Sequence, residues 1–173
     1  FNLLNGKERL IFFDPQEGTQ LDVFVGEFSM CHRLPLMDRL KVDPYTLGLA
    51  EVLLTKLQIV QLNEKDIRDI LLLLLQHEPR EDEDGERINL AAVAAPCATD
   101  WGFYKTVTDN LALGKARLAD AGLTAAEAGL VSERIAAIFF ARSAGRSAVS
   151  STTSSWGRIW KRLTSCEIGI SPR

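Results

Sequence analysis

The sequence has few of the residues that bind transition metals or cross-link a chain. It contains three cysteines and two histidines, and Cys31, Cys97 and Cys166 lie far apart. Their spacing matches neither a zinc-ligand pattern nor a disulfide framework, which is typical of proteins kept in a reducing cytosol. We interpret the adjacent Cys31 and His32 as ordinary packing and surface residues. We therefore expect a cytoplasmic protein without a zinc site.

The sequence also lacks long apolar runs and a strong excess of one charge. No apolar stretch approaches the ~20 residues of a membrane-spanning helix, and no signal peptide is recognisable. The net charge of −3 gives no general attraction to nucleic acid. Apolar residues make up 46% and charged residues 25%, a composition typical of soluble globular domains. Because the chain opens with Phe1 in a stretch that resembles folded sequence, we expect further residues upstream.

Residues 49–75 (LAEVLLTKLQIVQLNEKDIRDILLLLL) form the stretch around which the chain is organised. At about 100° per residue, the first half of this stretch places its apolar residues on one side of a helix. These residues are Leu49, Val52, Leu53, Leu57 and Val60. Lys56 projects into the middle of the same side, although a lysine is rarely buried unless it is paired. The sequence thus predicts a helix with one ammonium group on its apolar face.

The second half of the stretch repeats this anomaly with acidic residues. Asp66 projects between Ile70 and Leu73 on an apolar face, and Asp69 lies at the edge of that face. Asn63 stands between the two halves and can end one helix or cap the next. We therefore predict a helical hairpin that points one ammonium and one or two carboxylates into its own apolar seam.

Two interpretations of this seam remain open. The first is an internal salt bridge, in which Asp66 is also favoured by the dipole at the first turn of its helix. The second is a lysine and an acid that line a pocket for an anionic ligand. Burying charges costs several kcal/mol per ion, so a fold that needed only stability would gain more from leucine at both positions.

The N-terminal region predicts a β-hairpin. Residues 9–13 and 21–25 are rich in β-branched and aromatic side chains, and turn-forming residues separate them. In the second strand Leu21 and Val23 face one way, and Asp22 faces the other. An aspartate is unfavourable in the middle of a strand. Without other information, we expect Asp22 at an exposed position on an edge strand or an open sheet face.

Three more helices are expected after the acidic loop of residues 78–86. The first covers residues 88–98, with Asn89 as its cap, and the second starts after Thr99 or Asp100 and ends at Gly122. Thr124 and Glu127 form a capping-box pattern for the third, which we expect to reach about residue 142. Expected core residues are Trp101, Tyr104, Val107, Leu111, Leu113, Leu130, Ile135, Ile138 and Phe139.

The chain divides into three parts by composition. Residues 1–42 form the strand region, residues 43–142 the helical domain, and residues 143–173 a tail. We expect residues 143–155, rich in Ser, Gly and Thr, to be a flexible linker. Residues 156–163 (WGRIWKRL) form an amphipathic pattern with a basic side. They are expected to dock on the body through their tryptophans, with a membrane-surface or nucleic-acid role as the alternative.

Three segments together resemble a known family. LDVFVG, DPYTLGLAEVLLTKLQ and NEKDIRDILLLL are similar to nucleotidyltransferase-like proteins of the DNA polymerase beta superfamily, and most similar to abortive-infection-type toxins. Asp22, between Leu21 and Val23, matches the third catalytic acid of that superfamily. Lys56 matches a helical lysine, and Asp66 and Asp69 match a basic-Asp-x-x-Asp pattern on the next helix. The chain departs from the family in having no Gly-Ser turn and no Asp-x-Asp pair before Asp22.

The resemblance implies an α+β fold, in which the last strands of a mixed nucleotidyltransferase-type sheet precede a larger helical domain. It implies transfer of a nucleotide from an NTP to a protein or RNA acceptor, with Mg²⁺ or Mn²⁺ as cofactor and an antitoxin as a further partner. Asp22, Lys56 and Asp66 would be catalytic and would line one cleft, with Asp22 at the metal. Lys56, Asp66 and Asp69 would bind the nucleotide. The alternative is a non-catalytic helical interaction module of a degenerate or truncated nucleotidyltransferase.

Overall fold

Alternating apolar and polar residues give the N-terminal region its short antiparallel strands. A computed structural model describes residues 2–43, 45–82 and 85–150. In it, α1 (Asn2–Asn5) precedes the hairpin of β1 (Arg9–Asp14) and β2 (Thr19–Phe24), which pairs Phe12 with Leu21. The turn between the strands ends at Gly18, whose φ of 64° favours glycine. This hairpin was predicted, and the structure confirms both strands.

The remaining strands are only two residues long. β3 (Phe28–Ser29) pairs with β4 (Arg33–Leu34) in an antiparallel arrangement, and β5 (Pro79–Arg80) pairs with β6 (Ile88–Asn89) in a parallel one. Within the described residues the strands thus form three separate two-stranded sheets. The fold is α+β as predicted, but the described strands do not join into one larger mixed sheet.

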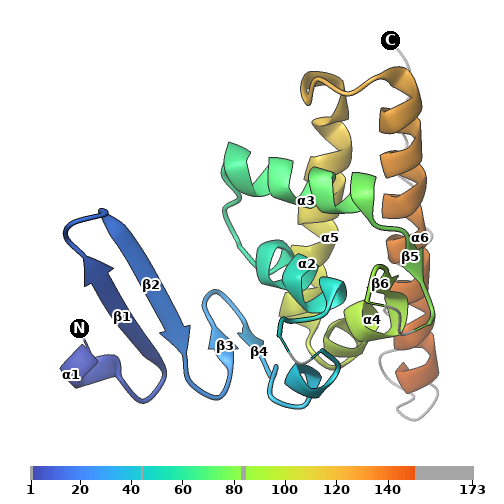
Figure 1. Ribbon diagram of the computed structural model, residues 1–173. Coiled ribbons are helices and arrows are strands. Elements are labelled where there is room, and N and C mark those ends of the chain that lie inside the picture. The colour runs from blue at the N-terminus through green and yellow to red at the C-terminus, as the bar shows by residue number, and fades with distance from the viewer. Residues whose placement is uncertain (1, 44, 83–84, 151–173) are drawn as a thin grey trace.

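The helices pack together beside this strand region (Figure 1). They are α2 (Leu49–Leu57), α3 (Glu64–Gln76), α4 (Leu90–Thr99), α5 (Trp101–Ala116) and α6 (Ala125–Ser150), with short 3₁₀ turns at η1 (Arg39–Lys41) and η2 (Leu118–Asp120). Their buried face contains Leu53, Leu57, Ile70, Leu74, Val93, Phe103, Val107, Leu111, Val131, Ile135 and Ile138. No helix in the described ranges is both long and apolar enough to cross a membrane.

Side-chain caps fix where α3, α4, α5 and α6 begin, as the sequence predicted. Asn63 accepts a hydrogen bond from the Asp66 backbone N–H at 2.9 Å, and Asn89 and Asp100 cap α4 and α5 in the same way. At α6, the hydroxyl and backbone N–H of Thr124 donate to the Glu127 carboxylate and hold its pKa below the usual value. Each cap satisfies N–H groups that the helix itself leaves unpaired.

Two side chains from later helices cap the ends of earlier ones. Asn110 on α5 donates to the carbonyl oxygens of Leu57 and Ile59 at 2.9 and 2.7 Å. Arg134 on α6 donates to the carbonyls of Leu74 and Leu75, both at 2.9 Å. These contacts satisfy carbonyl groups that have no partner within α2 and α3. They tie the hairpin of α2 and α3 to the rest of the helical body.

The structure corrects the predicted extent of the first helix. α2 ends at Leu57, so Val60 lies outside it and is 61% exposed instead of belonging to its apolar face. The carbonyls of Leu57 and Ile59 turn toward Asn110, and the chain leaves the helix there. Lys56 therefore stands in the last turn of α2, where a positive charge is favoured by the helix dipole.

Other core assignments also change. Trp101 was expected in the core but is 54% exposed, because it is the first residue of α5 and points outward. Phe103, two residues later, is the aromatic residue that α5 buries. In α6, Val131 is buried, whereas Leu130 is partly exposed. Leu72 in α3 is 50% exposed, although leucine stands on both sides of it in the sequence.

The predicted linker is partly helical. α6 continues through Ser150, so its backbone takes up residues 143–150 of the expected linker. A helix that has already formed grows more easily than a new one starts, and the alanines in this stretch favour its extension. The segment 156–163, expected to dock through its tryptophans, lies outside the described residues.

Replacing Asn110 with alanine should destabilise the fold by about 2–3 kcal/mol, because two carbonyls at the end of α2 lose their donor. Urea unfolding followed by circular dichroism measures this loss. Asp109→Ala is the matched control, since Asp109 is exposed on the same helix and forms an i,i+4 ion pair with Lys105. Its expected cost is at most about 0.5 kcal/mol. Equal losses in the two variants would contradict the capping role of Asn110.

Candidate functional site

Three of the predicted site residues meet where α2 approaches α3. The Lys56 Nζ atom lies 2.9 Å from Asp66 Oδ1 and 2.8 Å from Asp69 Oδ2. We call these three side chains the Lys56 cluster. One ammonium group therefore binds two carboxylates from the neighbouring helix. The structure confirms the prediction that a lysine on the first helix of the hairpin faces acidic residues on the second.

The start of α3 positions both acids of the cluster. Asp66 and Asp69 are three residues apart, so they lie on adjacent turns of the same helix face. Asn63 fixes the first turn by its hydrogen bond to the Asp66 N–H. Asp66 also gains from the positive end of the helix dipole, because it stands in the first turn. The local sequence thus places both acids on the helix face that meets Lys56.

Burial and charge act in opposite directions on Lys56. Partial burial disfavours the ammonium ion, but hydrogen bonds to Asp69 and Asp66, and the charges of both, raise the pKa of Lys56 above its usual value. Lys56 therefore stays charged across the physiological range. With both acids ionised, the cluster has one more negative than positive charge.

The three members differ in their access to solvent. The side chain of Asp66 is 12% exposed, that of Lys56 is 29% exposed, and that of Asp69 is 37% exposed. Asp66 is thus the fixed partner, whereas Asp69 lies at the solvent side. A ligand could approach the ammonium from that side and displace Asp69 without unpacking the helices.

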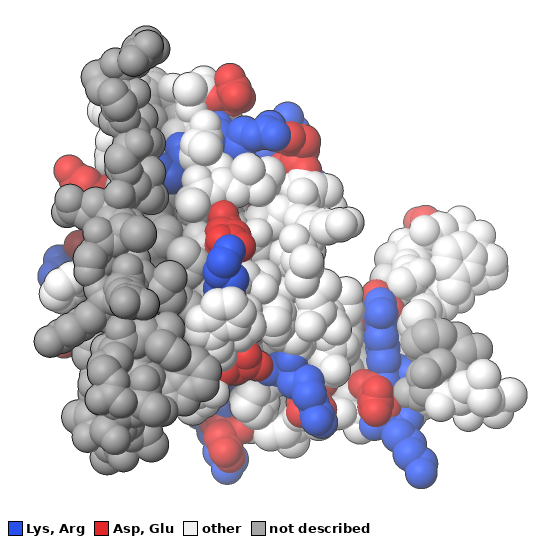
Figure 2. Space-filling model, turned by 180° about the vertical axis from the view of Figure 1, so that it is seen from behind, with Lys and Arg blue, Asp and Glu red and all other residues white. Residues whose placement is uncertain are grey.

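Asp22 lies elsewhere, on the β1–β2 hairpin. Its Oδ1 atom is 3.0 Å from Arg9 Nη2, and its Oδ2 atom accepts a hydrogen bond from Gln20 at 3.1 Å. The hairpin stands apart from α2 and α3 (Figure 1), and it projects from the helical body in the view from behind (Figure 2). The structure therefore brings Lys56, Asp66 and Asp69 together but does not bring Asp22 to them.

The predicted metal residue Asp22 and the acids of the Lys56 cluster do not form a site that fits a magnesium ion. Mg²⁺ is usually held by one or two carboxylates with oxygen atoms free to coordinate it. Both oxygens of Asp22 already have partners, and one oxygen of Asp66 and one of Asp69 contact the Lys56 ammonium group. Across the described ranges, no group of three or more His, Cys, Asp or Glu side chains could hold a metal.

Sequence reasoning overlooked one buried acid, Glu51. It stands in the first turn of α2, and its Oε1 atom lies 2.6 Å from Nε of Arg39. Only 2% of the residue is exposed. The run LAEVLL could have indicated a buried and paired acid, because one acid among apolar residues is unusual on a buried helix face. Its partner could not be found from the sequence, since η1 is joined to α2 through an irregular segment.

Comparisons with protein-family models, with curated proteins and with solved structures found no match to this chain.

Lys56→Met should lower the free energy of unfolding by an amount that depends on pH. Because Lys56 is partly exposed, we expect a loss between the ~1 kcal/mol of exposed pairs and the ~3 kcal/mol of buried ones. The folded pKa of Lys56 is raised, so its stabilising effect is complete below the unfolded pKa of about 10.4 and is lost as pH rises through the folded pKa. Urea unfolding of wild type and variant from neutral to strongly alkaline pH measures this difference.

The control for this experiment is Lys65→Met, which removes an exposed lysine beside Asp66. Its difference from wild type should stay close to zero at neutral pH. A Lys56→Met difference that stays constant through the alkaline range would contradict the assignment, because it would then come from packing and not from charge.

Proposed function

We propose that this chain binds a nucleoside triphosphate at the Lys56 cluster and serves as the helical part of a nucleotidyltransferase. The observation that carries this proposal is one lysine held by two carboxylates at 2.9 and 2.8 Å, with part of its side chain open to solvent. A lysine ammonium is a compact point charge that binds phosphate oxygens. The match of all three residues to the family pattern supports the same conclusion.

The two acids have different roles in this proposal. Asp66 is nearly buried and orients the ammonium of Lys56. Asp69 is more exposed, and a phosphate oxygen takes its place beside Lys56 when the nucleotide binds. The displaced Asp69 is then free to accept a hydrogen bond from the sugar or the base. This exchange avoids placing a phosphate next to an ammonium that two carboxylates already neutralise.

The remaining parts of the proposed activity rest on the sequence resemblance alone. These are the transfer of the nucleotide to an RNA or protein acceptor, the use of Mg²⁺ or Mn²⁺, a nucleotidyltransferase-type sheet and an antitoxin partner. Asp22 would have to release Arg9 before it could serve such a metal.

The exposed hairpin favours a second candidate, a non-catalytic interaction module. Phe12, Leu21 and Val23 lie on one face of β1 and β2 in the observed register, and all three are exposed. Figure 2 shows this region standing away from the helical body, with few charged groups at its outer end. Exposed apolar patches of this kind commonly mark contact surfaces. In this candidate the Lys56 cluster only stabilises the hairpin of α2 and α3.

Substitutions in the Lys56 cluster should change nucleotide affinity in opposite directions. Lys56→Met should weaken binding of Mg–ATP or another NTP by roughly 1.5–3 kcal/mol, the contribution of a charged hydrogen bond. Asp66→Asn should also weaken it, because the ammonium loses its fixed partner. Asp69→Asn should leave affinity unchanged or increase it, because it removes a negative charge that competes with phosphate. Isothermal titration calorimetry of the full chain measures all three.

Lys65→Met is again the control, and it should retain most of the affinity. If a phosphate oxygen replaces Asp69 beside Lys56, the Asp69→Asn variant should bind NTP most tightly of the three and the Lys56→Met variant most weakly. If all three cluster variants lose stability while NTP affinity stays at the wild-type value, the proposal fails. A folded wild-type chain that binds no NTP would instead favour the interaction module.

A further inference from the structure

An apolar groove lies on the surface between α4 and α6. Its cavity measures about 590 Å³, with Ala91, Ala94, Ala95 and Ala98 on the α4 side and Phe140 on the α6 side. We call it the α4–α6 groove. Phe140 is 78% exposed, and Ala91 and Ala95 are exposed as well. The groove is therefore open to a segment that packs on these two helices.

The two helices that form the groove lack the charged residues that a surface helix turns toward water. α4 (LAAVAAPCAT) contains no charged residue. α6 contains none from Ile135 through Ala141 (IAAIFFA). A helix that is apolar on all sides is usually buried. The composition of both helices thus indicates that another part of the protein covers the groove.

Residues 156–163 (WGRIWKRL) have the sequence pattern of a segment that covers such a groove. Trp156, Ile159, Trp160 and Leu163 follow the i, i+3, i+4, i+7 spacing of one helix face. The other positions include two arginines and a lysine but no acid. Large rings on one surface and alanines on the other fit together, because small side chains leave room for large ones.

The end of α6 places this segment within reach of the groove. α6 extends to Ser150, and about 15 Å of helix separate that residue from Phe140. Residues 151–155 span up to about 17 Å when extended. The chain can therefore reverse after Ser150, so that residues 156–163, about 12 Å long as a helix, return along α6 to Phe140.

The charge at the groove is opposite in sign to that of the segment. Glu81 also lines the groove, and it is the one charged residue among the described residues that do so. Arg158, Lys161 and Arg162 in the segment are positive. Exposed ion pairs add little stability, but they favour one orientation of a docked segment over another.

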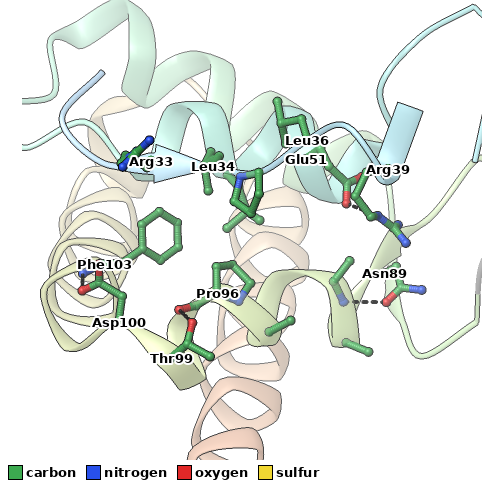
Figure 3. A pocket seen from close by; sticks show the side chains of 15 residues that line it. Arg33, Leu34, Leu36, Arg39, Glu51, Asn89, Pro96, Thr99, Asp100 and Phe103 are labelled. Carbon is green, nitrogen blue, oxygen red and sulfur yellow. Dashed lines mark hydrogen bonds and ion pairs between the residues drawn. The ribbon is translucent and has the colours of Figure 1, made fainter. Parts of the chain in front are cut away.

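Two other apolar surfaces are less accessible to this segment. The first is a cavity of about 670 Å³ on the other side of α4, which Leu34, Pro96 and Phe103 help to surround (Figure 3). No described residue of α6 lines that cavity, so the segment would have to cross α4 to enter it. The second is the exposed face of the β1–β2 hairpin, which lies on the far side of the helical body from α6 (Figure 1).

From these observations, we infer that residues 156–163 of this chain occupy the α4–α6 groove. Trp156 and Trp160 pack against Phe140 and the alanines of α4, and the basic residues face Glu81 and water. This inference is independent of the proposed nucleotide site, because no member of the Lys56 cluster lines the groove.

Tryptophan fluorescence of the full chain tests this inference. The chain has three tryptophans, so Trp101→Phe leaves Trp156 and Trp160 as the only ones that emit. In this variant we expect blue-shifted emission and weak quenching by acrylamide, both lost on unfolding in urea and both independent of protein concentration. Emission as red and as strongly quenched before unfolding as after it would overturn the inference. Protection that appears only at high protein concentration would also overturn it, because a second copy would then supply the covering surface.

Two substitutions in the Trp101→Phe background locate the contact. Ala98→Arg places a charged side chain in the groove but not in the cavity of Figure 3, and it should raise acrylamide quenching to the level of the unfolded chain. Phe140→Ala should also raise quenching, because the tryptophans lose their aromatic contact. Since Phe140 is 78% exposed, this variant tests the contact even if Ala98→Arg fails to fold.

Ala136→Arg is the matched control for both substitutions. Ala136 is exposed on α6 but does not line the groove, so this variant should leave the quenching unchanged. Circular dichroism checks that each variant is folded. Quenching that stays unchanged in Phe140→Ala, or that rises equally in Ala136→Arg, would overturn the inference.

Discussion

The charge of Lys56 constrains how α2 and α3 can be joined. An ammonium group on a helix face that packs against another helix must be paired, because an unpaired buried charge costs several kcal/mol. The second helix meets this requirement by placing Asp66 and Asp69 one turn apart, at 2.9 and 2.8 Å from Nζ. The Asn63 cap sets where α3 starts and therefore which face carries the acids. If α3 were rotated by one residue about its axis, both carboxylates would turn away from Lys56.

The rest of the helical body holds this arrangement through polar contacts to helix ends. Asn110 and Arg134 reach from later helices to the last carbonyls of α2 and α3. Buried Gln58 accepts a hydrogen bond from the His32 backbone N–H at 2.8 Å, which ties the β3–β4 segment to the end of α2. Apolar packing alone lacks such directionality, so these bonds are what fix the register of the helices. The open side of the Lys56 cluster depends on that register.

Features encoded by neighbouring residues could be predicted from the sequence. The helix caps, the β1–β2 hairpin and the meeting of Lys56 with Asp66 and Asp69 follow from spacings of a few residues. The early end of α2, the exposed Trp101 and the Glu51–Arg39 pair could not be predicted, because each depends on residues distant in the chain or on the start of a neighbouring element. Residues 143–150 were predicted to be a linker because they are rich in serine and glycine. They are helical, because the preceding helix α6 extends through them. The position of Asp22 shows the limit of a motif, since a match in sequence does not place a residue beside its expected partners.

In the proposed nucleotide complex, Lys56 exchanges one carboxylate for a phosphate. ¹⁵N-detected NMR of the lysine ammonium groups observes this directly, because ammonium groups held in ion pairs exchange slowly enough with water to give signals. We expect a Lys56 signal in the free protein that moves on addition of Mg–NTP and that remains visible, while the signals of other lysines stay in place. A Lys56 signal that stays unchanged while calorimetry shows nucleotide binding to the same sample would contradict this exchange.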